Sequence, residues 1–318
     1  MNFLITGGCG YIGSVLTKAL LEEGHKVLVF DSFWFGNSHK QNKNLKVVKG
    51  DVRNFSNLNI KSIHTIIHLA NVANDPTVEL NPNLSWEINV LASKLVAEHA
   101  IKNKVKRLIF FSSGSVYGVK KEKKVTEELK LSPISVYNKT KMIAERVFLS
   151  YKNQINITCL RPATVCGLSE RLRLDLTVNK LTFDAFFKKK MFVDGGQQVR
   201  PNIHIEDVVR LIKHIALTKK KFKHNIYNIG FENLSILQIA KNVQKVVNSK
   251  IHITKNVNDI RSYRIDSSKL LKLGFLPKKN INNAINEIND YYFNNIDKIK
   301  MNCFSLEWLK TNQSKFFK

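Results

Sequence analysis

A glycine-rich turn near the start of the chain constrains the fold more than any other feature. Residues 2–6 have the apolar pattern of a buried strand, and residues 14–21 have the pattern of a helix packed on it. The turn between them has glycines at motif spacing: Gly7 (or Gly8), Gly10 and Gly13. Glycines let such a turn approach a pyrophosphate, whose charge then lies at the helix N-terminus. The sequence therefore predicts a dinucleotide-binding strand–turn–helix unit.

The residues that follow this unit favour NAD over NADP. Residues 26–30 predict a second strand, and Asp31 stands at its end. An acid at this place accepts hydrogen bonds from the adenosine ribose hydroxyls and repels a 2′-phosphate. The alternative is a chance glycine-rich turn in a protein that binds no nucleotide. The position of the turn between two strand patterns favours the NAD interpretation.

Size and composition predict a cytoplasmic protein. The chain has 318 residues and 43% hydrophobic residues, enough for one large α/β domain with an appended lobe. The first strand begins at once, and no apolar run reaches the length of a membrane span, so we expect neither a signal peptide nor a membrane partner. The four cysteines show no C-x-x-C pair, which predicts reduced thiols and no metal site.

The net charge of +26 raises the question of a nucleic-acid partner. The basic clusters are scattered, lysine-dominated and not interleaved with aromatic residues. The chain is also rich in Asn and Ile, which favours a compositional bias as the origin of the charge. We therefore expect no nucleic-acid partner, although a basic surface would help attract an anionic substrate.

The order of the predicted elements indicates an α/β fold with a doubly wound parallel sheet of the Rossmann type. Short apolar runs predict further strands at 45–49, 64–69, 107–111, 155–160 and 225–229. Between them, helical patterns cover 84–102, 136–152 and 205–217. Strands that alternate with helices are typical of a sheet with right-handed crossovers.

A smaller C-terminal α/β lobe for the substrate is predicted beside this sheet. We expect residues 1–165 to form the dinucleotide-binding domain, to which residues 205–230 return. The lobe would comprise residues 166–204 and 231–295, with helices at 235–247 and 280–293 and a strand at 251–254. Residues 163–205 show no regular pattern, and residues 296–318 form a tail with no assigned structure.

Tyr137 and Lys141 are four residues apart on a predicted helix, so their side chains share one face. A nearby ammonium group favours the phenolate and lowers the pKa of a tyrosine from its usual value near 10. Such a tyrosine can remove a proton from a sugar hydroxyl while hydride leaves the same carbon. The alternative is an ordinary Tyr/Lys pair on a helix surface, because this spacing is common by chance.

A serine-rich loop supports the catalytic interpretation of this pair. Ser112 and Ser113 follow the strand at 107–111 directly, and ligands bind at the carboxyl ends of strands in such sheets. The Ser113 hydroxyl can donate to the substrate oxygen and steady a developing alkoxide. The alternative is a polar loop of turn-forming residues.

Taken together, these motifs resemble those of extended short-chain dehydrogenases/reductases, in the NAD-dependent nucleotide-sugar epimerase/dehydratase family. The resemblance covers about residues 1–293 and identifies Ser113, Tyr137 and Lys141 as the catalytic triad. It implies NAD as cofactor and, often, a homodimer. The cofactor-binding residues that it implies are Gly7, Gly10, Tyr11, Ile12, Gly13, Asp31, Asp51, Val52, Leu69, Ala70, Asn71, Ser112, Tyr137 and Lys141. Asn89 matches a structural asparagine of the central helix.

The resemblance also implies a nucleotide-diphosphate sugar as substrate. Ser113 would contact the sugar, and Thr164 stands where galactose epimerases carry an asparagine that contacts substrate. Arg200 and Arg261 are the implied phosphate ligands. The arginine fork also suits a diphosphate in a chain that otherwise prefers lysine, which adds Arg173 as a candidate. Arg171 and Arg264 lie in the same segments, with surface salt bridges as the alternative.

The branch of the family is indicated by the residues after Ser113. The 4,6-dehydratases usually carry an Asp-Glu pair there, where this chain has Gly114 and Ser115. The decarboxylases commonly carry a glutamate at the place of Ser115. We therefore expect a 4-epimerase of bacterial surface-polysaccharide precursors. The alternative is a 4-dehydrogenase that releases the ketone, because the segment around Thr164 is similar to that of heptose dehydrogenases.

Overall fold

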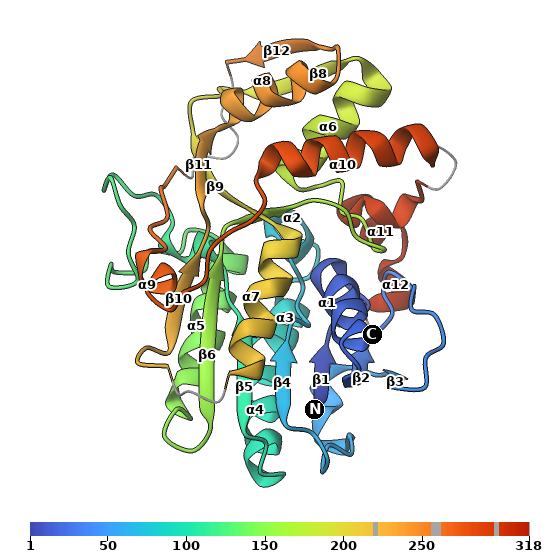
Figure 1. Ribbon diagram of the computed structural model, residues 1–318, viewed down its shortest axis with the longest axis vertical. Helices are drawn as coiled ribbons and strands as arrows, with labels where there is room; N and C mark the ends of the chain where they lie inside the picture. The colour runs from blue at the N-terminus through green and yellow to red at the C-terminus, as the bar shows by residue number, and fades with distance from the viewer. Residues whose placement is uncertain (219–221, 256–261, 296–298, 318) are drawn as a thin grey trace.

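A seven-stranded parallel sheet forms the centre of the molecule in the computed structural model, which describes residues 1–218, 222–255, 262–295 and 299–317 (Figure 1). The strand order is β10-β6-β5-β4-β1-β2-β3, the doubly wound order with β10 added at one edge. The strands are β1 (Asn2–Thr6), β2 (Lys26–Asp31), β3 (Leu45–Lys49), β4 (Thr65–His68), β5 (Arg107–Phe111), β6 (Asn156–Pro162) and β10 (Ile226–Ile229). The predicted fold class is confirmed.

Helices cover both faces of the sheet, which explains why its strands are apolar on both sides. On one face α1 (Tyr11–Glu22) and α7 (Ile205–Leu217) pack against side chains such as Phe3 and Ile5. On the other face α4 (Ala92–Lys102) and α5 (Val136–Ser150) pack against side chains such as Leu4. Alternate residues of β1 therefore belong to opposite layers of the core.

The smaller lobe lies beyond the carboxyl ends of the strands, at the top of Figure 1. Its sheets pair β11 (Glu232–Ser235), β9 (Val199–His204) and β7 (Thr164–Cys166), and separately β12 (Lys250–Thr254) with β8 (Lys190–Asp194). Its longer helices are α6 (Thr177–Lys188), α8 (Ile236–Val246) and α10 (Ile281–Asn294). The predicted helices and strand of residues 235–293 are thus confirmed within a few residues.

The prediction that residues 163–205 are irregular was wrong. This segment contains β7, α6, β8 and β9. The strands are short, and α6 begins after Leu176 without a side-chain cap, so the local start signal of a helix is missing. β7, α6 and β8 are stabilised instead by a shared core with α8 and α10, and β9 pairs with β7 and β11.

The tail, to which the sequence assigned no structure, forms helices that return to the glycine-turn side of the sheet. It contains η5 (Met301–Cys303), α11 (Ser305–Thr311) and α12 (Gln313–Phe316). The Trp308 indole donates to the carbonyl of Trp34 at 2.6 Å, and Phe316 stacks on the Trp34 ring. The end of the chain is thereby held against the loop that follows β2 (Figure 1).

The helix predicted at 84–102 is interrupted near its start. It consists of α3 (Pro82–Trp86), the π-helical turn η2 (Glu87–Leu91) and α4. The turn contains Asn89, whose side chain accepts from the Val72 amide at 2.8 Å and donates to the Thr140 hydroxyl at 3.1 Å. Asn89 therefore connects the segment after β4 to α5, a structural role.

A buried ion pair fixes α5 on the sheet. Arg161 on β6 makes two hydrogen bonds to Glu145 on α5, at 2.5 and 3.0 Å, and the two side chains are 4% and 2% exposed. Arg161 also donates to the Tyr117 hydroxyl at 2.7 Å, and that hydroxyl donates to Asn228 on β10 at 2.8 Å. The pair thus joins α5, two strands and η3 (Gly114–Tyr117), which follows Ser113.

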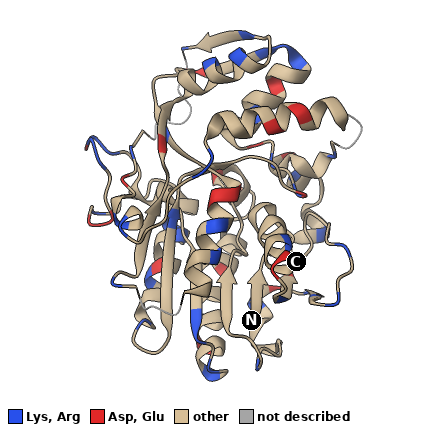
Figure 2. Cartoon of the chain, viewed as in Figure 1, with Lys and Arg blue, Asp and Glu red and all other residues tan. Residues whose placement is uncertain are grey.

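The net positive charge is distributed over many elements. Figure 2 shows Lys and Arg from the lobe to the lower end of the sheet, with Asp and Glu between them. Within the described ranges, no helix combines the length and the apolar character that crossing a membrane requires.

Replacing Glu145 with Gln should lower the free energy of unfolding by about 3–5 kcal/mol, because the Arg161 charge stays buried without its partner. Urea unfolding measures this loss. The control is Glu98→Gln, which breaks an exposed pair with Lys94 and should cost about 0.5 kcal/mol or less. Equal effects of the two changes would contradict a structural role for the buried pair.

His68, at the end of β4, should make stability depend on pH. Its ring bonds the Thr6 hydroxyl at 2.7 Å, and burial, aided by the nearby Lys141 charge, lowers its pKa to about 3. Between about pH 6.5 and pH 3 the unfolded chain binds a proton at His68 that the folded chain does not. The titration of His68 therefore leaves the free energy of unfolding unchanged above pH 6.5 and lowers it as the pH falls toward 3. Urea unfolding at pH 7, 5.5 and 4.5 should show the advantage of the wild type over His68→Asn shrinking as the pH falls. A difference in unfolding free energy between the two proteins that stays constant with pH would contradict this role of His68.

Candidate functional site

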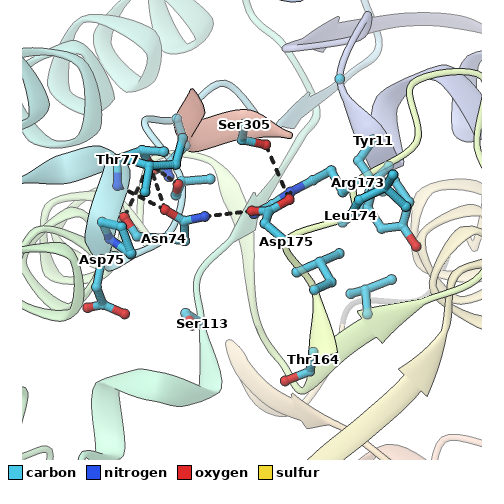
Figure 3. A pocket seen from close by; sticks show the side chains of 18 of the residues that line it. Tyr11, Asn74, Asp75, Thr77, Ser113, Thr164, Arg173, Leu174, Asp175 and Ser305 are labelled. Carbon is cyan, nitrogen blue, oxygen red and sulfur yellow. Dashed lines mark hydrogen bonds and ion pairs between the residues drawn. The ribbon is translucent and has the colours of Figure 1, made fainter. Parts of the chain in front are cut away.

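A pocket of about 770 Å³ lies where the carboxyl ends of the sheet strands face the lobe. Its wall combines the glycine turn, the segment after β4, the Ser112–Ser113 loop and α5 with residues of the lobe and of the tail. Figure 3 shows Ser113 and Thr164 on one side of the pocket and Asn74, Asp175 and Ser305 on another. The site therefore joins parts of the chain that are far apart in sequence.

Two glycines of the turn are packed too closely for any other residue. Gly7 has a φ of +69°, and a Cβ there would lie 2.7 Å from the amide nitrogen of Ala70. A Cβ on Gly13 would lie 2.3 Å from the carbonyl oxygen of Gly7. The turn therefore lies directly on the end of β4, with the start of α1 against it. The turn residues that line the pocket are Gly7, Gly10, Tyr11, Ile12 and Gly13.

Asp31 ends β2 beside this turn, but it does not line the pocket. Its carboxylate accepts from the amides of Cys9 at 3.0 Å and Phe33 at 2.8 Å. Burial raises the pKa of Asp31, while these two hydrogen bonds act to lower it. The two amides thus orient the carboxylate at the place where the ribose contact is predicted.

The other predicted cofactor residues divide into two groups. Leu69, Asn71 and Ser112 line the pocket, whereas Asp51, Val52 and Ala70 do not. Asp51 accepts from the amide of Arg53 and forms an ion pair with its guanidinium at 2.8 Å, and Val52 is buried. Ala70 lies behind the glycine turn, as the close approach of Gly7 requires.

The three predicted catalytic residues all line the pocket. Ser113 follows β5, and its hydroxyl lies 2.7 Å from that of Ser115. Tyr137 is half-buried at the start of α5, one turn before Lys141. The Lys141 ammonium donates to the Phe111 carbonyl at 2.7 Å, and burial lowers the pKa of Lys141 to about 7. An additional acceptor or anion beside this ammonium would stabilise its charged form.

Thr164, Arg173 and Arg200 lie on the lobe side of the same pocket. Thr164 begins β7, and Arg200 belongs to β9 and is buried. Arg173 pairs with Asp175, with its Nε donating at 3.1 Å. The structure thus brings these three predicted substrate residues together. Arg261 lies outside the described residues.

Several pocket residues were missed by the sequence reasoning, and Asp175 connects them. It accepts from the Asn74 amide at 2.6 Å and from the Ser305 hydroxyl at 3.2 Å (Figure 3). Asn74 has a φ of +72° and a ψ of 160°, a backbone conformation that is rare for residues other than glycine. No local pattern places Ser305 in the pocket, because its position depends on the fold of the tail.

The residues of the pocket fit a dinucleotide. At Gly10, which lines the pocket, a Cβ would meet the Gly7 carbonyl at 3.1 Å and no other described atom within 4 Å. In the part of the chain that the structure describes, the Ser112 hydroxyl is buried with no hydrogen-bond partner. A buried polar atom without a partner is unfavourable until a ligand supplies one.

A separate cluster of His204, Glu206 and Glu287 brings one ligand atom each within 4.8 Å of one another. Its carboxylates are already paired, since the Lys279 ammonium donates to Glu206 at 2.7 Å and to Glu287 at 2.6 Å. We interpret this cluster as a salt bridge that joins α7 to α10.

Comparison with known proteins agrees with this geometry. The model of the NAD dependent epimerase/dehydratase family matches residues 3–230. A UDP-glucose 4-epimerase of Lactobacillus helveticus is 28% identical over 90% of this chain and 95% of its own length. A UDP-glucuronic acid decarboxylase of Xenopus tropicalis is 26% identical over 92% of this chain and 72% of its own.

Solved structures agree as well. The UDP-glucuronic acid 4-epimerase of Bacillus cereus, solved with UDP-glucuronic acid and NAD, is 28% identical and superimposes with a TM-score of 0.83 over 92% of this chain and 99% of its own. From the glycine turn, the pocket and these matches together, the chain belongs to the NAD-dependent epimerase/dehydratase family and is an NAD-dependent enzyme.

Proposed function

We propose that the chain is a nucleotide-sugar 4-epimerase, which inverts C4 of a sugar through a 4-keto intermediate. The observation that carries the proposal is that Ser113, Tyr137 and Lys141 line one pocket with the glycine turn. The epimerases of Lactobacillus helveticus and Bacillus cereus, which match this chain over nearly their whole length, support it. Within this proposal the enzyme is a cytoplasmic homodimer that makes precursors of bacterial surface polysaccharides.

Each of the three residues has a distinct role in this proposal. Tyr137 takes the proton of the C4 hydroxyl and later returns it. Lys141, whose ammonium is fixed by the Phe111 carbonyl, favours the Tyr137 phenolate and binds the nicotinamide ribose. Ser113 donates to the C4 oxygen as it becomes a ketone. NAD supplies the hydride acceptor at C4 and then the hydride that is returned to the other face.

The nucleotide-diphosphate part of the substrate would lie against the lobe, residues 166–204 and 231–295. Thr164 would contact the sugar, while Arg173, Arg200 and Arg261 would bind the diphosphate, for which the arginine fork is suited. Because Arg173 is paired with Asp175, the net charge that this pair offers is small. Arg200 is buried in β9 and lines the same pocket, so it is the second described candidate.

The loop after Ser113 favours epimerisation over dehydration or decarboxylation. Gly114 and Ser115 occupy the places where those branches carry acidic residues, and Ser115 is buried with its hydroxyl against Ser113. A Cβ on Gly114 would lie 2.6 Å from Ile265, so a larger residue there requires a shift. The alternative is a 4-dehydrogenase, for example of a GDP-heptose. It is favoured by Thr164, which stands where galactose epimerases have asparagine.

Changing Tyr137 to Phe should lower kcat by roughly 10²–10⁴-fold, because it removes the group that moves the proton. Initial rates with the best substrate measure this, together with NAD content per protomer, which should be unchanged. The matched control is Tyr151→Phe, since Tyr151 lies just beyond α5 and away from the pocket. Full activity of Tyr137→Phe would show that another group is the base.

The reaction itself is tested by incubating the purified protein with UDP-glucose, UDP-glucuronate and GDP-linked sugars. An epimerase gives the C4 epimer, identified by NMR, with no net NADH because the hydride is returned. Accumulating NADH with a released ketone would establish the dehydrogenase instead. Loss of water or of carbon dioxide, detected by mass spectrometry, would overturn both.

A further inference from the structure

Arg171 is a buried cation with unused hydrogen-bonding capacity. Its side chain belongs to the segment between β7 and α6, is 6% exposed and lines the pocket. Among the described residues, neither its Nε nor its Nη1 has a hydrogen-bond partner. The sequence alone allowed Arg171 to be either a phosphate ligand or part of a surface salt bridge, and its burial excludes a surface salt bridge.

The surroundings place Arg171 on the cofactor side of the pocket. Its guanidinium lies over the ring of Phe35, at 3.8 Å, in the loop that follows β2. Its backbone amide donates to the Ser169 hydroxyl, which in turn donates to the carbonyl of Tyr11 at 2.7 Å. Tyr11 is the first residue of α1, directly after the glycine turn. The segment that carries Arg171 is thus joined to the turn predicted to hold the pyrophosphate.

Among the described residues, the tail supplies the one hydrogen bond that this guanidinium makes. Nη2 of Arg171 donates to the Ser305 hydroxyl at 2.9 Å. That hydroxyl donates to Asp175, which pairs with Arg173. Ser305 therefore fixes Arg171 next to Phe35 while Asp175 remains with the neighbouring arginine.

The charge of Arg171 is under-compensated in this environment. Burial, and next the nearby positive Arg173, lowers the pKa of Arg171 to about 9, although the charges of Asp175 and Asp31 act to raise it. A guanidinium buried without a full set of partners is unfavourable, and an anion with adjacent oxygens compensates it best. A diphosphate is such an anion, and arginine binds it with two parallel N–H groups.

We propose that Arg171 binds the diphosphate of NAD, and that Ser305 of the C-terminal segment is the positioning residue that holds its guanidinium. The proposal concerns the cofactor and does not depend on which sugar the enzyme converts. It adds a ligand from the lobe side to those of the glycine turn. The cofactor would thereby be held from two opposite parts of the chain.

The test compares Arg171→Met, Ser305→Ala and the control Arg146→Met, which removes the same charge from an exposed position of α5 outside the pocket. NAD retained per protomer is measured first by chromatography of the denatured protein. The NAD dissociation constant is then titrated calorimetrically after the cofactor has been removed by dialysis. UDP is titrated in parallel, because the substrate diphosphate is the other source of the same chemistry.

Arg171→Met should weaken NAD binding roughly tenfold to a hundredfold, the range of a lost charge-assisted hydrogen bond. Ser305→Ala should weaken NAD binding by less than Arg171→Met does, and Arg146→Met should change NAD affinity by no more than about twofold. UDP affinity should stay unchanged in all three variants. Without NAD, the melting temperature of Arg171→Met should equal or exceed that of the wild type, because a buried unpaired charge has been removed. The increase in melting temperature caused by NAD should be smaller in Arg171→Met than in the wild type.

Unchanged NAD affinity in Arg171→Met would overturn the proposal, and loss of UDP affinity alone would assign the guanidinium to the substrate. A melting temperature that falls without NAD, with affinity intact, would show a structural role only. Should Arg171→Met fail to fold, Arg171→Lys carries the test. It keeps the charge but not the fork, and it should still weaken NAD binding. None of these measurements uses turnover, so failure of the proposed epimerase reaction would leave them interpretable.

Discussion

The close contact between the glycine turn and the end of β4 is the constraint on which the rest of the site depends. Gly7 approaches the Ala70 backbone so closely that any Cβ would clash, and Gly13 brings the start of α1 against the same turn. The ends of β1 and β4 are neighbours in the sheet, so this contact defines the floor of the pocket. The catalytic loop after β5 and the segment after β4 are arranged around it.

Much of the sheet could be predicted because its strands are buried on both faces and therefore read as short apolar runs. The strand at 107–111 and the helix at 205–217 match the observed bounds. The segment 163–205 could not be predicted, because its strands are short, α6 has no side-chain cap, and its elements are stabilised by contacts with helices about 50 to 120 residues later. Sequence patterns within a window of about a dozen residues carry no information about contacts between residues so far apart in the chain.

The same distinction applies to the site. Tyr137 and Lys141 share one helix and Ser113 follows one strand, so local rules sufficed to place them in one pocket. The contacts of Asp175 with Asn74 and Ser305 join residues more than 100 positions apart, and nothing local indicates them. The unpartnered nitrogens of Arg171 are likewise invisible in sequence, since they follow from burial and not from residue type.

Because residues of the tail line the pocket, the order in which the chain is synthesised decides when the pocket can be complete. A ribosome makes the glycine turn first and the pocket wall at 304–309 last. A nascent chain that has emerged to β10 already has every strand of the main sheet and all three predicted catalytic residues. It still lacks Ser305, and with it the support of Arg171 and one partner of Asp175. The pocket is therefore complete only once the tail has been made.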